Sequence, residues 1–274
     1  MKPRIAPALG IAVAALALAG LRPAPADEKG KALLREAFRT LHAARTYQAA
    51  FSLTIAPAGA PPLVLKGNLA AMKPNFFRLK LDGQAPGGGQ KIGLNYVSDG
   101  KYYYQHGGGP TYGKDEVEPN PTQFAGRWEG EVDAFFGGEK LLGARTVTVT
   151  GTETVGGVPC DLLKVSPQQN GPVVLYAVGK IDHLIRRCVL TFEGGGRALT
   201  QTNLLTDVKI NESQKPADFV FTPPAGAREQ FANLVPVGKP APDFNLPELK
   251  GGQVALSDLR KGKKAVLINF WFYN

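Results

Sequence analysis

The sequence predicts a mainly β fold, an antiparallel sheet that is preceded by one helix and interrupted by a short helical insertion. From about Glu28 to Arg45, apolar residues recur every three or four positions, which is the pattern of an amphipathic helix. After residue 46 the period changes to two, most clearly from Phe51 to Ile55, which is typical of half-buried strands. Asp99-Gly100 separates two further strand-like stretches and is a hairpin signal, so neighbouring strands are expected to be antiparallel.

About ten strands are expected along the chain. They fall near residues 51–55, 62–72, 77–81, 92–98, 101–105, 145–155, 159–166, 172–178, 184–193 and 197–211. Between residues 119 and 142 the sequence predicts one or two short helices instead, with aromatic anchors at Phe124, Trp128, Phe135 and Phe136. The expected order is therefore helix, antiparallel strands, helical insertion and further antiparallel strands.

The first 26 residues are typical of a secretory signal peptide. Lys2 and Arg4 precede an apolar run from Ile5 to Leu21, and Ala24-Pro25-Ala26 fits a cleavage site. We expect an exported protein of the periplasm or cell envelope that is cleaved after Ala26, with an uncleaved tether as the alternative. Because the leader carries three basic residues and no acid, its removal lowers the formal net charge from +9 to +6.

Composition and motifs argue against several classes of function. The mature chain is only mildly basic and has no Lys/Arg block with interleaved aromatic residues, so a nucleic-acid partner is not expected, whereas contact with a membrane surface stays open. Isolated histidines without a metal-binding motif predict no metal site; they are His42, His106 and His183. Three glycine runs lack the context of a phosphate-binding loop, so they are expected to be hairpin loops and no cofactor is predicted; they are residues 87–89, 107–109 and 194–196.

The two cysteines of the chain are not expected to form a disulfide. Cys160 and Cys188 fall on predicted strands that have a third strand, 172–178, between them. In a meander, two strand spacings separate them by about 9.6 Å, which is beyond the reach of a disulfide. Both are expected to be small buried hydrophobic side chains, although an exported protein with two cysteines leaves a disulfide as the alternative.

Several stretches, taken in order, resemble the LolA-like superfamily of periplasmic lipoprotein carriers. Together they cover residues 28–227; they are the amino-terminal helix, KPNFFRLKL, YVSDGKYYYQ, VGGVPCDLLKV, LIRRCVLTF and DVKINESQKPADFVFTPPAGA. The resemblance implies a strongly curved, incomplete antiparallel barrel, with helices over its open side and an apolar cavity that holds acyl chains or lipidated partners. None of these stretches is catalytic.

The residues themselves allow such a cavity. One amphipathic helix and a short insertion cover the apolar face of a curved sheet incompletely, which leaves space for a lipid tail. For each candidate lining residue, a place in a dry core is the alternative. The candidates are Phe51, Leu53, Ile55, Phe77, Leu79, Tyr96, Phe135 and Phe136.

The sequence changes character after Pro223-Pro224. From about residue 236 to 274 it resembles the opening of the redoxin branch of the thioredoxin superfamily, which includes peroxiredoxin-like and exported thiol-disulfide oxidoreductases. Many positions agree in order and spacing, among them Ala241-Pro242-Asp243-Phe244, Leu256-Ser257-Asp258-Leu259 and Val266-Leu267-Ile268-Asn269-Phe270-Trp271. The last of these stretches is expected to be a buried strand.

In that family, the strand leads to a helix whose first turn carries a reactive cysteine. The free amide groups and the dipole at the start of a helix stabilise a thiolate there. The sequence ends at Asn274, about one residue before that position, and this segment contains no cysteine. We therefore expect a truncated, thioredoxin-like α/β segment that is not active as an enzyme, from a parent that is a thiol-disulfide oxidoreductase or peroxidase.

The expected organisation is a signal peptide (1–26), a LolA-like β domain (27–227), a linker (228–236) and the start of a redoxin-like domain (237–274). Three functions remain open. The β domain binds a lipid or lipidated partner, with a thiol oxidoreductase in the full-length parent. Alternatively, the chain is part of an envelope oxidoreductase or peroxidase, with its own redox partner, in which the β domain is a docking module. The third is a non-enzymatic envelope sensor or structural protein. The first is favoured for this chain.

Overall fold

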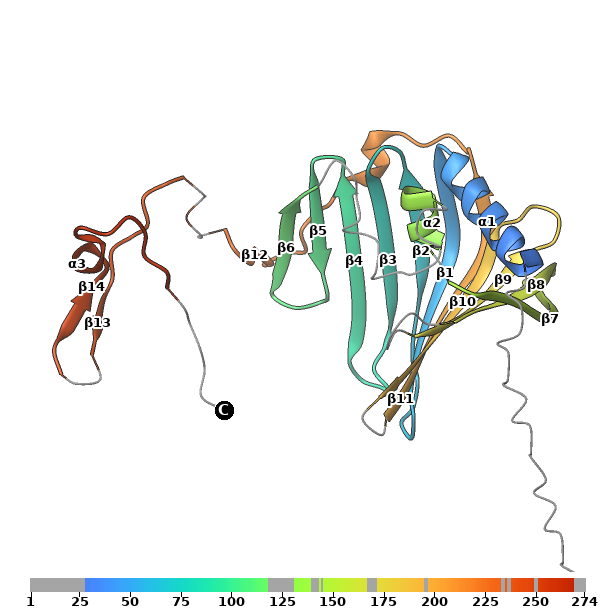
Figure 1. Cartoon of the computed structure of the whole chain (residues 1–274), viewed down its shortest axis with the longest axis horizontal. Coiled ribbons are helices and arrows are strands. Elements are labelled where there is room, and N and C mark those ends of the chain that lie inside the picture. The colour runs from blue at the N-terminus through green and yellow to red at the C-terminus, as the bar shows by residue number, and fades with distance from the viewer. Residues whose placement is uncertain are drawn as a thin grey trace, which may run out of the picture.

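A computed structural model of the chain describes residues 28–117, 131–138, 143, 145–166, 172–194, 197–232, 235, 238–248 and 251–268. Within these residues the chain is mainly β, with one large curved antiparallel sheet and few helices (Figure 1). The predicted fold class is confirmed at this level. The signal peptide, the anchors Phe124 and Trp128 and the residues from 269 onward lie outside the described part of the chain.

The large sheet is built from two meanders. The first contains β1 (Thr46–Pro57), β2 (Leu63–Met72), β3 (Phe76–Gln84), β4 (Lys91–Asp99), β5 (Tyr102–His106) and β6 (Thr111–Glu116). The second contains β7 (Val147–Val155), β8 (Val158–Val165), β9 (Val173–Gly179), β10 (Ile185–Gly194) and β11 (Arg197–Ile210). The meanders join because β1 pairs with both β2 and β11, which leaves β6 and β7 toward opposite edges of the sheet.

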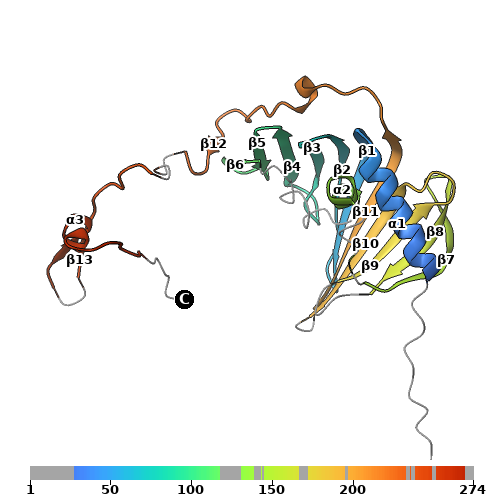
Figure 2. The same ribbon diagram turned by 45° about the horizontal axis from the view of Figure 1, so that its top comes forward.

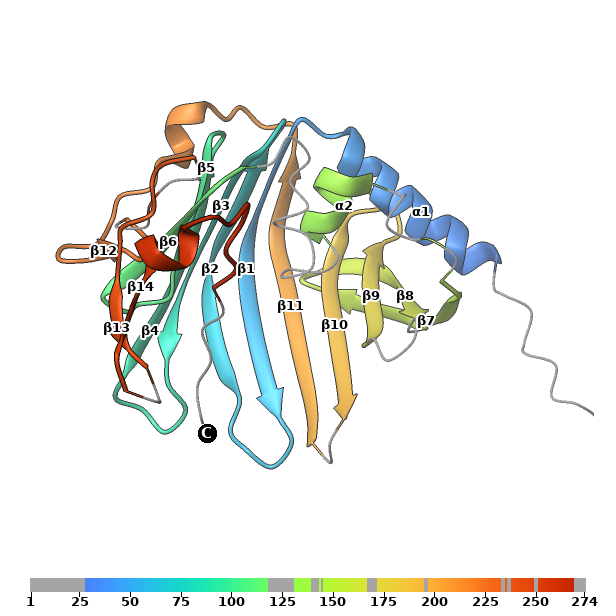
Figure 3. The ribbon, with the colours of Figure 1, turned by 60° about the vertical axis from the view of Figure 1, so that its left-hand side comes forward.

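Two helices lie on the concave face of the sheet (Figures 1 and 3). Helix α1 (Glu28–Ala43) turns Leu34, Phe38 and Leu41 into the core, as its apolar period predicts. Helix α2 (Glu131–Gly137) confirms a short helix in the insertion and buries Phe135 completely. The α1 backbone passes close to β7, since a Cβ atom on Gly30 would lie 3.0 Å from the Val147 carbonyl oxygen.

The core lies between these helices and the concave side of the strands. Alternate residues of each strand point inward, so Leu53 has Leu65 of β2 and Asn203 of β11 as its cross-strand neighbours. Aromatic contacts tie the helices to the sheet. Tyr47 stacks on Phe135 with ring centres 6.0 Å apart, and Phe38 meets the edge of Tyr176 at 6.1 Å. Burial of each such ring stabilises the fold by roughly 1.5–3 kcal/mol.

A segment that we call the strap, residues 211–229, follows β11 and crosses the other side of the first meander (Figure 2). It contains a 3-10 turn, η2 (Pro216–Phe219), whose Phe219 is fully buried and packs on Phe76. Further along, Phe221 stacks on Tyr104 with ring centres 4.7 Å apart. The strap ends in β12 (Arg228–Glu229), which pairs in parallel with β6. It therefore covers an edge strand that would otherwise expose its backbone groups.

Most of the predicted strands and turns are present in the structure. The ten predicted strands are confirmed within a few residues, and β6 and β12 were not predicted. The Asp99-Gly100 hairpin is also confirmed: Gly100 has a φ of +91°, and the Asp99 carboxylate accepts a hydrogen bond from the Lys101 amide at 2.8 Å. Residues 87–89 and 107–109 lie in loops between strands, as expected, whereas run 194–196 is only partly described.

The cysteines are not joined in a disulfide. Cys160 packs with Val155 and Ala177, while Cys188 belongs to the main core on the other face of the sheet. Burial raises the pKa of the Cys160 thiol, which lowers its reactivity. We expect both thiols to resist a thiol reagent in the folded protein and to react fully after denaturation, as measured by intact mass. A mass that shows no free thiol after denaturation without reductant would contradict this arrangement.

The carboxy-terminal segment forms a small unit of its own, which Figures 1 and 2 show apart from the large sheet. Strands β13 (Asn245–Pro247) and β14 (Gln253–Ala255) form a hairpin, and helix α3 (Leu256–Arg260) follows. The Asp243 carboxylate accepts a hydrogen bond from the Ser257 amide at 2.9 Å, and hydrogen bonding from the Ser257 side chain, followed by this amide, lowers the pKa of Asp243. None of the helices in the described part of the chain has the length and apolar content needed to span a bilayer.

The buried strand predicted for residues 266–271 is wrong over the residues that the structure describes. Residues 266–268 have no strand conformation, and Leu267 is 96% exposed. The apolar run has a strong β propensity, but a strand is stable only when a neighbouring strand accepts its backbone hydrogen bonds. In the described segment, β13 and β14 pair with each other and leave residues 266–268 without such a neighbour.

Candidate functional site

One candidate site is a band of half-buried apolar side chains on the concave face, which we call the apolar strip. It consists of Ile55, Leu63, Ile92, Leu94 and Tyr96. Cross-strand pairing makes the strip continuous with the buried core, because Leu94 lies opposite Leu81 and Tyr96 lies opposite Leu79. The strip is therefore the part of the inner face where core-type residues reach solvent.

The position of the helices explains why these residues are only half buried. Helix α1 packs against α2 and β7, and Figure 1 shows α2 in front of β1 and β2, where Phe135 stacks on Tyr47. The described helices thus cover the second meander and the start of the first, whereas Ile92, Leu94 and Tyr96 on the inner face of β4 stay half-buried. An apolar face that the chain's own helices leave accessible is a typical place for an apolar ligand or partner.

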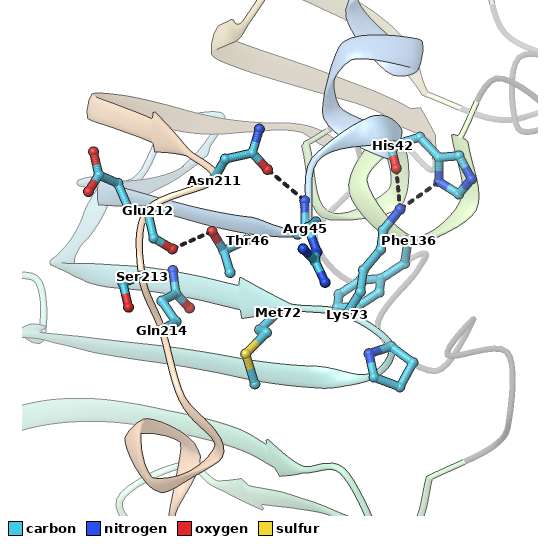
Figure 4. Close-up of a pocket in the computed structure, with 11 residues that line it drawn as sticks. His42, Arg45, Thr46, Met72, Lys73, Phe136, Asn211, Glu212, Ser213 and Gln214 are labelled. Carbon is cyan, nitrogen blue, oxygen red and sulfur yellow. Dashed lines mark hydrogen bonds between the residues drawn. The ribbon is translucent and has the colours of Figure 1, made fainter.

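A second candidate site is an open pocket of about 900 Å³, which we call the rim pocket. It lies where α1 leads into β1, where β2 ends and where the chain leaves β11 (Figure 4). Its lining is mixed, with charged, polar and apolar side chains. The lining residues are His42, Arg45, Thr46, Met72, Lys73, Pro74, Phe136, Asn211, Glu212, Ser213 and Gln214.

Hydrogen bonds between distant parts of the chain hold the rim pocket together. The Arg45 amide donates to the Asn211 side-chain oxygen at 2.8 Å, and the Thr46 hydroxyl donates to the Glu212 carbonyl at 2.7 Å. The Lys73 amide donates to the Arg45 carbonyl at 3.0 Å. These bonds fix the backbone of three separate segments around the pocket, so its shape does not depend on one flexible loop.

Lys73 is one of the cations that line the rim pocket. Its ammonium donates to the His42 carbonyl and lies 5.3 Å from the centre of the Phe135 ring. The His42 Nδ1 atom lies 3.4 Å from this ammonium and 3.2 Å from the Phe135 carbonyl oxygen. Burial lowers the pKa of Lys73 from its ordinary value. The ammonium is thus partly desolvated and is held by neutral acceptors and a ring face.

A buried polar cluster lies beneath α2. Glu131 is completely buried, and in the described structure neither carboxylate oxygen has a hydrogen-bond partner. Burial raises the pKa of Glu131 to about 8, with a smaller contribution from the charge of Asp133. The Tyr47 hydroxyl is also buried without a partner, and its pKa is raised by burial and by the charge of Glu131. Glu131 is therefore a neutral carboxylic acid at pH 7.

Comparison with a protein family gives one match. Residues 139–230 match a family described as "Predicted periplasmic protein (DUF2092)". The matched range runs from the end of the insertion through the second meander to the end of the strap. The match confirms the periplasmic location that the leader predicts. It does not extend to the segment from residue 237 onward, and no curated protein matches the chain.

Several solved structures are similar to this chain. MucB from Pseudomonas aeruginosa, solved in complex with MucA, is 12% identical over 83% of this chain and 74% of that one, with a TM-score of 0.41. LprF from Mycobacterium bovis is 10% identical over 66% and 93%, with a TM-score of 0.41. The LolA superfamily protein NE2245 from Nitrosomonas europaea is 9% identical over 70% and 97%, with a TM-score of 0.35.

The eight residues predicted to line a cavity all belong to, or pack against, one core cluster. Ile55 and Tyr96 lie in the apolar strip, and Phe136 lines the rim pocket. The other five are at most 3% exposed; they are Phe51, Leu53, Phe77, Leu79 and Phe135. Their role as ligand contacts stays a prediction.

Sequence reasoning did not find the rim pocket. Arg45, Lys73 and Asn211 are far apart in the sequence and belong to no motif, so only the fold brings them together. A weak signal existed in retrospect. Lys73 follows the predicted strand 62–72 directly, and Arg45 ends the predicted helix that leads into the first strand; in a meander, the start of one strand and the end of the next lie at the same edge of the sheet.

Proposed function

We propose that this periplasmic protein binds the acyl chain of a lipid or of a lipidated protein on the concave face of its sheet. The observation that carries the proposal is the apolar strip, which extends the core to solvent on the inner face of β4 and at the ends of β1 and β2 that contain Ile55 and Leu63. The curvature of the sheet favours a narrow apolar ligand over a flat surface. The resemblance of residues 28–227 to the LolA-like carriers supports the same function.

The energetics are sufficient for such a ligand. Each methylene that leaves water contributes about 0.8 kcal/mol, so six methylenes on the strip contribute on the order of 5 kcal/mol. Part of this free energy offsets the entropy lost on binding. Half-buried side chains suit this role, because they already lie in fixed positions among core residues and lose little further freedom.

The test compares two charged substitutions on opposite faces of the sheet. Leu94→Lys places an ammonium in the strip and is expected to weaken the binding of a fluorescent fatty acid by at least about tenfold. The bound acyl chain would remove water from this ammonium, which costs free energy. Val64→Lys is the matched control, because Val64 is 38% exposed and alternates with inward-facing Leu63 and Leu65. Equal binding by both variants and the unmodified protein, at unchanged melting temperature, would contradict the proposal.

We also propose that residues 237–274 are the opening part of a redoxin-like domain. The motif residues quoted above support this proposal. Helix α3 begins on the stretch Leu256-Ser257-Asp258-Leu259, and the β13–β14 hairpin lies between this stretch and Ala241-Pro242-Asp243-Phe244. The gene sequence beyond codon 274 tests it. An in-frame cysteine within a few codons, followed by about a hundred further codons, is expected. A frame that continues without a cysteine near this position would refute the proposal.

A further inference from the structure

The rim pocket lies far from the apolar strip and differs from it in chemistry. Strand β2 begins in the strip at Leu63 and ends at the pocket with Met72, a length of about 30 Å at roughly 3.3 Å per residue. The strip is apolar, whereas the pocket contains Arg45, Lys73 and His42. One small ligand group therefore cannot contact both sites, and a ligand of the rim pocket must be a different chemical group from the acyl chain.

Two cations share the pocket on a fixed backbone. Arg45 follows α1 and Lys73 follows β2, and the hydrogen bond from the Lys73 amide to the Arg45 carbonyl makes them neighbours. Arg45 is exposed, and among the described residues no hydrogen bond or ion pair is made by its guanidinium. Among the described residues, the Lys73 ammonium contacts the His42 carbonyl and ring and the Phe135 ring, and it has no ion pair with a carboxylate.

The carboxylate of the pocket does not neutralise these cations. Among the described lining residues the acidic one is Glu212, and it contributes its backbone carbonyl as the acceptor for Thr46. In Figure 4 its carboxylate points away from Arg45 and Lys73, on the far side of the chain that leaves β11. Two adjacent cations without a carboxylate between them repel each other, and a bound anion would remove that repulsion.

We propose that the rim pocket binds an oxyanion, a phosphate or carboxylate group, through the Arg45 guanidinium and the Lys73 ammonium. The guanidinium presents paired N–H donors that match the two oxygens of such a group, and the ammonium adds a second charge. The pocket volume of about 900 Å³ leaves room for the rest of the molecule. The oxyanion belongs either to a small soluble compound or to the headgroup of an anionic lipid.

The test uses the full chain, at constant ionic strength, with two probes. Inorganic phosphate is titrated by calorimetry, and vesicles of phosphatidylglycerol are compared with vesicles of phosphatidylcholine by sedimentation. Arg45→Gln is expected to weaken the binding of whichever anionic probe binds by at least about tenfold, because charge-assisted hydrogen bonds are lost. Since the guanidinium makes no hydrogen bond or ion pair with the described residues, its loss is expected to leave the melting temperature unchanged.

Lys80→Gln is the matched control. It removes the same charge from an exposed position on β3 that is not part of the pocket. Binding of free phosphate that depends on Arg45 supports the proposal and identifies a small anion as sufficient, and binding of phosphatidylglycerol vesicles alone supports it with a lipid headgroup as the source. No binding to either probe, or an equal loss in both variants, overturns it.

The two variants distinguish a failure of the oxyanion proposal from a failure of the proposed acyl binding. Leu94→Lys changes the apolar strip and is expected to leave the Arg45-dependent binding of the anionic probe unchanged. If Leu94→Lys abolishes fatty-acid binding while Arg45→Gln does not affect either anionic probe, acyl binding stands and the oxyanion site is refuted.

Discussion

Replacement of Glu131 by glutamine is expected to stabilise the protein by about 3 kcal/mol at pH 7. Glu131 is completely buried and has a pKa of about 8, against an ordinary value of 4.5. Between these pH values the folded state holds a proton that the unfolded state releases. The free energy of unfolding therefore falls by about 1.4 kcal/mol for each pH unit in this range. Glutamine is neutral at every pH and removes this cost.

The stabilisation expected for Glu131→Gln depends on pH between about 4.5 and 8. Below about pH 4.5 both states carry the proton, so Glu131→Gln is expected to change stability little. The difference grows as pH rises and levels off above about pH 8, where both states are ionised. Urea unfolding at pH 5, 7 and 8.5 measures it. Glu36→Gln, at an exposed position of α1 paired with Arg39, is expected to give a small difference that does not grow in this way. A constant difference for Glu131→Gln would contradict the buried, neutral carboxyl.

Periodicity predicted most of the regular structure because it reports local burial. Helix α1 and the inward-facing residues of β1 and β3 follow directly from the spacing of their apolar residues. Strand β6 was missed because its sequence, TYGKDE, has no apolar alternation and its outer edge is completed by the distant β12. The reverse error occurred at residues 266–268, where an apolar run has no strand partner in the described segment. Pairing is a tertiary property that no local pattern contains.

Of the two candidate sites, the sequence predicted part of one and none of the other. The apolar strip was partly predicted, through Ile55 and Tyr96, because apolar residues on strands are visible in the sequence. The rim pocket was not, because its hydrogen bonds join residues 166 positions apart, as in the Arg45 amide to Asn211 contact. The sequence also did not predict that Glu131 is buried. A glutamate at the start of a short helix is an ordinary surface feature, and only the packing of α2 against the core makes it unusual.

Replacement of Gly67 by alanine is expected to destabilise the protein by about 3 kcal/mol or more. Gly67 lies in the middle of β2, on the inner face between Phe51 and Leu81. A Cβ atom at this position would lie 1.8 Å from the Lys80 carbonyl oxygen and 2.8 Å from its carbon. These are backbone atoms of β3, so no side-chain rotation relieves the clash, and the two strands must separate. Overpacking of this kind costs 1–3 kcal/mol even where side chains can adjust.

The physical reason lies in the curvature of the sheet. A glycine inside a strand marks a place where another part of the backbone approaches closely, and the approach of β3 over Gly67 is such a place. Gly113→Ala in β6 is the matched control, since the nearest atom to its Cβ position, in the Gln105 side chain, lies at 3.8 Å. Gly113→Ala is expected to be neutral or slightly stabilising, because alanine loses less entropy on folding than glycine. Melting temperatures of the two variants measure the contrast, and equal values would show that the backbone of β3 does not exclude a side chain at position 67.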